Sequence, residues 1–203
     1  VITRCEDLEE LYVSNCTIHE FPQDVYKWDS LKVMEIVGVE LCSLPSTIGH
    51  CVNVQHLNIA FNKLQQLPTE IGQLTGLKSL NAENNLLSAL PKDVGSCLQL
   101  REINIKSNMI CKLPPEIEKL HNLRTLLADN NCLTKISPHI RGCRKLENMS
   151  INANSLFDLP SDIGNLDQLQ KISVRNNHIR TIPREIGNCL LLESMDFGKN
   201  EIV

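Results

Sequence analysis

Cysteine and histidine are the side chains of this sequence with the widest chemical repertoire, and the chain has nine cysteines and six histidines among its 203 residues. Five of the cysteines are 46 residues apart: Cys5, Cys51, Cys97, Cys143 and Cys189. Regularly spaced thiols of this kind are consistent with three kinds of site: a disulfide framework, a metal site or a nucleophile. Each kind of site requires that the fold bring two or more of these groups together.

Motifs that carry catalysis are missing from the sequence. It contains no G-x-S-x-G, H-E-x-x-H, C-x-x-C, P-loop or dinucleotide-binding pattern. The histidines fall at six different places in the period of the sequence: His19, His50, His56, His121, His139 and His178. General acid–base catalysis needs groups within hydrogen-bond reach of each other, which this scatter does not favour. We therefore expect no enzymatic activity, catalytic residue, cofactor or metal within these residues.

A period of 23 residues must position all of these side chains. With Leu8 as position 1, that position recurs without insertion at Leu31, Val54, Leu77, Leu100, Leu123, Leu146, Leu169 and Leu192. Positions 4, 6 and 11 are apolar in every repeat. Position 9 is Asn62, Asn85, Asn108, Asn131, Asn154, Asn177 and Asn200, whereas the first two repeats have Cys16 and Val39 there. A period in this range indicates a repeat protein.

The spacing within one repeat predicts its local structure. Positions 4 and 6 alternate as on one face of a short strand, and positions 3, 5 and 7 then face solvent. The buried asparagine at position 9 needs backbone partners in its own turn and the next. The segment typified by "LPTEIGQL" (67–74) predicts a short helical or 3₁₀ turn, begun by proline and ended by glycine. One such unit cannot bury its apolar face, so the units must stack into an α/β solenoid.

These residues resemble the leucine-rich repeat family, whose pattern LxxLxLxxNxLxxLPxxIGxLxx covers the whole chain. The resemblance implies a horseshoe with a parallel β-sheet on its concave face and short turns on its convex face. The 23-residue "LPxxIGxL" form is similar to the class in intracellular signalling scaffolds, which includes Ras–Raf pathway scaffolds, Scribble/LAP polarity proteins, plant Ras-group repeat proteins and Roco proteins. Val39 replaces the asparagine of position 9, and Pro138 lies at position 16 of its repeat instead of position 15. Both departures predict local irregularities.

The distance between stacked repeats decides how the five cysteines that are 46 residues apart, which we call the cysteine column, are interpreted. Neighbouring strands lie about 5 Å apart, so thiols in every second repeat are roughly 10 Å apart, beyond the ~7 Å that a disulfide allows between Cα atoms. We expect buried thiols that act as small apolar groups. Cys111 and Cys132 lie in adjacent repeats, where a bond is possible in principle. Many free thiols favour a reducing compartment, so we expect a cytoplasmic protein.

Charge and hydropathy exclude further classes of function. The net charge of −4 and the isoelectric point near 5.9 argue against nucleic-acid binding. No apolar run reaches the ~18 residues of a membrane span. Residues 1–203 are read as one domain of eight full repeats from Leu8, with partial repeats at both ends, where Ile2 and Cys5 fit positions 18 and 21 of a preceding unit. We expect an excerpt of a longer array.

The candidate binding surface is the concave face, where positions 3, 5, 7 and 8 are free of the repeat's own requirements. The predicted partner-binding residues are Tyr12, Glu35, His56, Asn58, Phe61, Asn81, Glu83, Glu102, Asn104, Lys106, Leu127 and Asp129. Apolar anchors among polar neighbours are typical of protein interfaces. Positions 3, 5 and 7 carry six acidic residues against three basic ones, which favours a partner with a basic surface.

Together these observations predict a protein–protein interaction module of a signalling scaffold. The family resemblance implies a Ras-type small GTPase or a phosphatase–kinase assembly as the partner. Two alternatives stay open: the recognition segment of a larger enzyme, such as a Roco kinase or a cyclase, and an extracellular receptor ectodomain.

Overall fold

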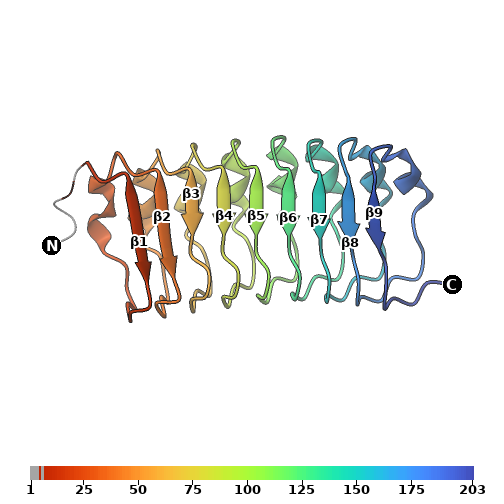
Figure 1. The fold of residues 1–203 in the computed structure, drawn as a ribbon, viewed down its shortest axis with the longest axis horizontal. Coiled ribbons are helices and arrows are strands. Elements are labelled where there is room, and N and C mark those ends of the chain that lie inside the picture. The colour runs from red at the N-terminus through yellow and green to blue at the C-terminus, as the bar shows by residue number, and fades with distance from the viewer. Residues whose placement is uncertain (1–4, 6) are drawn as a thin grey trace.

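The computed structural model describes Cys5 and residues 7–203, and these form one sheet of nine parallel strands in chain order (Figure 1). Ile2 lies outside the described residues. The strands are β1 (Glu10–Ser14), β2 (Val33–Val37), β3 (His56–Asn58), β4 (Ser79–Asn81), β5 (Glu102–Asn104), β6 (Thr125–Leu127), β7 (Asn148–Ser150), β8 (Lys171–Ser173) and β9 (Ser194–Asp196). The fold is a leucine-rich repeat solenoid, as predicted.

Each of the strands β1–β8 is followed by a 3₁₀ helix on the other side of the sheet (Figure 1). These helices are η2 (Gln23–Lys27), η3 (Ser46–His50), η4 (Thr69–Gln73), η5 (Lys92–Ser96), η6 (Pro115–Lys119), η7 (Pro138–Gly142), η8 (Ser161–Asn165) and η9 (Arg184–Asn188). In all but η7, a proline is the N-cap, as Pro68 is with φ −65° and ψ 149°. The capping proline therefore precedes the first turn rather than lying within it, although η6 has a second proline, Pro115, inside the turn. In η7, Ser137 is the cap and Pro138 follows, as the irregular spacing predicted.

The glycine at position 19, near the end of five of the 3₁₀ helices, has a different role from the predicted one. A helix-ending glycine would have a positive φ, yet the one glycine with positive φ among the described residues is Gly38, in a loop. A Cβ on Gly72 would lie 2.5 Å from the carbonyl oxygen of Asp93, and one on Gly95 would lie 2.6 Å from that of Glu116. The expectation of a helix terminator was wrong, because this glycine allows two stacked repeats to approach closely.

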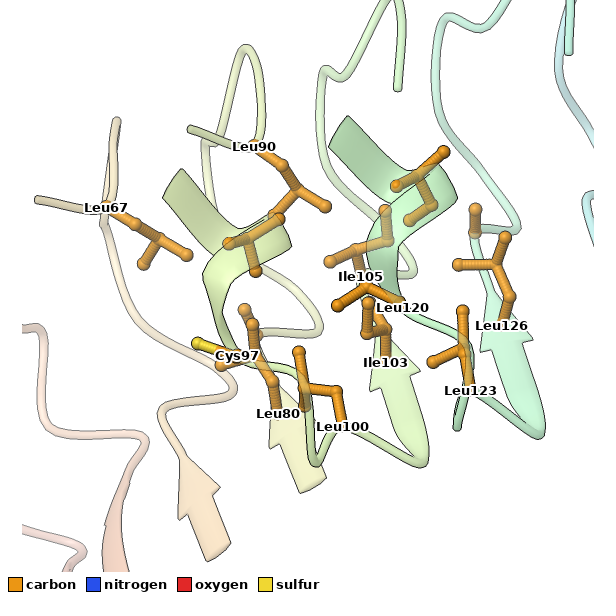
Figure 2. Close-up of a cluster of buried hydrophobic side chains, with 14 of the residues drawn as sticks. Leu67, Leu80, Leu90, Cys97, Leu100, Ile103, Ile105, Leu120, Leu123 and Leu126 are labelled. Carbon is orange, nitrogen blue, oxygen red and sulfur yellow. The ribbon is translucent and has the colours of Figure 1, made fainter. Parts of the chain in front are cut away.

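The core is a continuous column of aliphatic side chains between the sheet and the 3₁₀ helices (Figure 2). The register pairs each residue with the one 23 later, as in Leu80↔Ile103, so one position of the repeat meets itself in the next. Positions 4 and 6 are buried in nearly every repeat. Each buried aliphatic side chain contributes roughly 1.5–3 kcal/mol relative to exposure, which explains how a chain with 3% aromatic residues stabilises this length.

The asparagines at position 9 form the predicted ladder. The Oδ1 of Asn85 accepts from the backbone N–H of Leu64 at 3.0 Å, and its Nδ2 donates to the carbonyl oxygen of Ile59 at 2.9 Å. The same side chain thus joins two repeats and satisfies buried backbone groups. The ladder begins at the third repeat. Val39 is flanked by Gly38 and Glu40, which both have positive φ, so the predicted irregularity is present.

Candidate protein-binding surface

A shallow groove of about 370 Å³ crosses the exposed face of β1–β5, and we call it the sheet-face groove. It is lined by Tyr12, Val33, Glu35, His56, Leu57, Asn58, Ser79, Asn81 and Glu102. Six of these are predicted binding residues, and the structure brings them together. Val33 and Ser79 were missed as site residues, although they belong to the same position-3 column as His56 and Glu102. That shared column was the signal that could have found them.

The charge of the sheet face is divided along the solenoid. Lys106 pairs with Asp129 at 3.1 Å, and Arg175 pairs with Asp196 at 3.7 Å. Four carboxylates of this face remain without a cationic partner among the described residues: Glu10, Glu35, Glu83 and Glu102. All four belong to the first five repeats. The acidic character predicted for the whole face is therefore concentrated over β1–β5, where the groove lies.

Tyr12 stands at one end of the groove with its side chain largely exposed. Its hydroxyl donates to Oε2 of Glu10 at 3.1 Å. This hydrogen bond raises the pKa of Tyr12, and burial and the negative charges of Glu10 and Glu35 act in the same direction. The phenol therefore keeps its proton to a higher pH than an isolated tyrosine does. An exposed ring with a polar end is a typical interface anchor.

The asparagines at position 5 use half of their hydrogen-bonding capacity internally. The Oδ1 atoms of Asn58, Asn81 and Asn104 each accept from the backbone N–H two residues later, at 3.1–3.2 Å. Asn104 also donates through Nδ2 to Oε2 of Glu83 at 2.9 Å. The amide groups of Asn58 and Asn81 have no acceptor among the described residues. These two donors line the sheet-face groove and are available to a partner.

Asp129 is not a surface residue, and its predicted exposure on the concave face was wrong. Its exposed fraction is 8%. One oxygen accepts from Ser150 Oγ at 2.6 Å and from the backbone N–H of Asn152 at 2.7 Å, and the other accepts from Lys106. In this repeat position 5 is Leu127 instead of asparagine. Its side chain therefore cannot accept the backbone hydrogen bond that the position-5 asparagines accept at the ends of their strands. Asp129 therefore belongs to the structure of the solenoid, and Lys106 is largely engaged with it.

Phe61 lies beside the sheet face rather than on it. It follows β3 at position 8, where every repeat has a residue with positive φ, and its own φ is 57°. It lines a separate hollow of about 330 Å³ with Lys63 and Leu86 at the edge where the strands end. The residue is 52% exposed. An exposed aromatic residue in a left-handed conformation is strained, and such strain is concentrated at functional sites.

Four of the five cysteines of the column are buried and unbridged, as predicted, whereas Cys5 is exposed, so its predicted burial was wrong. Cys51, Cys97, Cys143 and Cys189 are buried, whereas Cys111 and Cys132 are exposed, and all six are free thiols. Burial raises the pKa of Cys97 and of Cys143 to about 12. Among the described residues, no three His, Cys, Asp or Glu side chains are grouped so as to hold a metal ion. In the same part of the chain, no helix is long and apolar enough to cross a membrane.

Comparison with known proteins agrees with this geometry. The leucine-rich repeat family model matches residues 168–189. The solved structure of an LRR protein from Leptospira interrogans is 31% identical over 98% of this chain, with a TM-score of 0.94. The chain is a leucine-rich repeat protein. No curated protein matches this leucine-rich repeat chain in sequence.

Receptors also share the fold. A plant peptide hormone receptor, RGFR1 in complex with RGF2, is 26% identical over 98% of this leucine-rich repeat chain with a TM-score of 0.72. A TDR receptor is 24% identical over 98% of it, with a TM-score of 0.87, which shows the fold alone. The chain spans 51% of the Leptospira protein and 37% and 36% of the two receptors. A leucine-rich repeat fold of this kind serves as a protein-interaction module and is typically not an enzyme.

Proposed function

We propose that this chain is an intracellular protein-interaction module that binds a partner with a basic surface in the sheet-face groove. The observation that carries the proposal is the set of unpaired carboxylates beside exposed Tyr12 and the free amides of Asn58 and Asn81. Carboxylates attract and orient a basic partner, an aromatic ring supplies apolar contact area, and free amides bind a partner's backbone. The proposed centre of recognition is therefore the sheet face of repeats one to five.

The class of partner rests on the resemblance to the 23-residue signalling repeats. It favours a Ras-type small GTPase or a phosphatase–kinase assembly. The unbridged thiols support a reducing compartment and hence the cytoplasm. Neither the repeat resemblance nor the unbridged thiols support a catalytic centre within the described residues.

Charge reversal within the groove tests the proposal. The variant Glu35→Lys with Glu102→Lys changes two groove carboxylates. The matched control, Glu20→Lys with Glu193→Lys, makes the same change in net charge at two exposed residues outside the groove. Quantitative affinity purification from cytoplasmic extract compares the parent and both variants, after circular dichroism and melting confirm that all three are folded.

We expect at least one protein partner with a basic surface to be retained by the control and lost, by tenfold or more, from the groove variant. Tenfold corresponds to about 1.4 kcal/mol of binding free energy. Direct titration with a Ras-type GTPase, loaded with a GTP analogue or with GDP, then tests the narrower assignment. Equal capture by the two variants would remove the sheet-face groove from consideration as the binding site.

A further inference from the structure

Repeats five and six break the pattern of the 3₁₀ helices at the same position. Position 19 is glycine in five repeats: Gly49, Gly72, Gly95, Gly164 and Gly187. It is Glu118 in the fifth repeat and Arg141 in the sixth. The close approach is instead made one residue later by Gly142, where a Cβ would lie 2.0 Å from the carbonyl oxygen of Glu118. Stacking between η6 and η7 therefore differs from that of the regular repeats.

A groove opens beside this irregular pair of helices, and we call it the helix-side groove. It is lined by Glu118, Lys119, His121, Arg141, Gly142, Arg144, Lys145 and Asn165, and its volume is about 680 Å³. The hollows beside regular helix pairs have volumes of about 320 Å³ between η8 and η9 and about 230 Å³ between η4 and η5. The enlarged groove thus coincides with the two neighbouring repeats that have Glu118 and Arg141 in place of the position-19 glycine; the first repeat, with Tyr26, lacks it as well.

The helix-side groove is strongly basic in a chain whose net charge is −4. Four cations line it, with one carboxylate and a histidine: Lys119, Arg141, Arg144, Lys145, Glu118 and His121. The carboxylate is already engaged, since Glu118 Oε2 lies 2.7 Å from Nδ1 of His139. Arg141 lies 3.4 Å from Asp162, which is outside the lining.

Two of the cations have no hydrogen-bond or ion-pair partner for their side chains among the residues that the structure describes. These are Lys119 and Arg144, which are both exposed; Lys119 acts on the nearby Glu118 carboxylate through its charge alone. Lys145 donates to the neutral amide oxygen of Asn122 at 2.9 Å, so its charge is not compensated by that contact. His121 donates from Nδ1 to the carbonyl oxygen of Gly142 at 3.0 Å, which fixes its ring against the wall.

We propose that the helix-side groove is a second docking site, which binds an acidic segment of a protein partner. We choose an acidic ligand on charge complementarity, because guanidinium and ammonium groups pair with carboxylates. The arrangement suits several carboxylates in a chain better than a single small anion. The cations are distributed along the rim of two repeats, and none of the unpartnered buried polar atoms of the described residues belongs to the lining. The site lies on the helical side of the sheet and does not depend on the sheet-face groove.

Binding of a labelled acidic peptide tests the site. The probe is a fluorescein-labelled peptide of glutamate and glycine in alternation, and its affinity is measured by anisotropy for the intact chain and for two variants. The first variant is Lys119→Glu with Arg144→Glu. The second, Lys112→Glu with Lys135→Glu, reverses two exposed cations of the same two repeats outside the groove. Both variants carry the same net charge, so a nonspecific charge effect would weaken them equally.

We expect the groove variant to lose at least tenfold in affinity and the control to lose less than twofold. The loss should persist with Lys119→Gln and Arg144→Gln, which remove the cations without adding carboxylates. Equal weakening of the groove variant and the control would overturn the proposal. So would failure of the parent to bind the peptide. Displacement of the peptide by inorganic phosphate, at an ionic strength where chloride does not displace it, would also contradict it, because the site would then be a single-anion site.

Discussion

The thiol of Cys97 donates a hydrogen bond to the carbonyl oxygen of Ile71 at 3.2 Å (its place in the core is shown in Figure 2). That carbonyl already accepts the backbone N–H of Leu74 at the end of η4. The same thiol bond joins Cys143 to Ile117 at 3.3 Å. The 46-residue period of cysteine is therefore a period of hydrogen bonding between neighbouring repeats, in addition to apolar packing.

Thiol reactivity should separate the nine cysteines into two classes. In the native protein at neutral pH, we expect the five exposed cysteines to react rapidly with a thiol reagent, and the four buried ones, Cys51, Cys97, Cys143 and Cys189, to be protected. In denaturant without reductant, all nine should react. Mass spectrometry of the labelled peptides gives the count. Rapid native labelling of Cys97 or Cys143 would show that the column is accessible.

Alkaline pH should destabilise the solenoid through the same thiols. The folded-state pKa of Cys97 is raised to about 12 from a reference value of 9.0, so the protonated thiol is favoured in the fold. Its contribution is fully present below pH 9 and is lost as pH rises toward 12, because the unfolded thiol ionises first. Urea unfolding between pH 8 and 11 measures this loss. The variant Cys97→Ala with Cys143→Ala should be less stable at pH 8 and have a flatter dependence on pH. Identical slopes would contradict the assignment.

Asp129 should be important for stability. Asp129→Ala removes the acceptor for Ser150 and for the backbone N–H of Asn152, and leaves Lys106 unpaired. Loss of acceptors for buried groups costs about 1–3 kcal/mol. We expect a decrease of this size in the free energy of unfolding, measured with urea. Glu102→Ala, on the exposed sheet face, is the control and should change stability by less than about 0.5 kcal/mol. Similar values for both variants would mean that Asp129 is a surface residue after all.

Phe61 should reduce stability where it stands. A left-handed conformation costs a residue such as phenylalanine roughly 1–2 kcal/mol, whereas asparagine adopts it readily. Position 8 is asparagine at Asn15, Asn84, Asn130 and Asn176. We expect Phe61→Asn to raise the free energy of unfolding by about 1 kcal/mol and the reciprocal Asn84→Phe to lower it by a similar amount. Thermal and urea unfolding test both. A loss of stability in Phe61→Asn would show that contacts of the ring outweigh the strain.

The sequence by itself determined the fold because the period is strict. When each position meets its own counterpart 23 residues later, as Leu80 meets Ile103, a single repeat specifies the strand and the core of the array, and the asparagine ladder from the third repeat on. The same spacing was enough to exclude disulfides within the cysteine column. It also identified the columns of the sheet face, from which six of the predicted residues meet in the sheet-face groove.

Only the tertiary structure decided which polar residues are free. Asp129 and Glu83 occupy the same position of the repeat, yet Asp129 is buried by bonds to the next repeat, because Ser150 and Asn152 supply donors there. Gly72, Gly95 and Gly164 are each required by a neighbour's carbonyl 21 residues away, not by their own φ. The helix-side groove likewise depends on how Gly142 meets Glu118. These relationships arise between side chains and backbone of adjacent repeats, where small departures from the period change the packing, and a pattern that averages over repeats does not contain them.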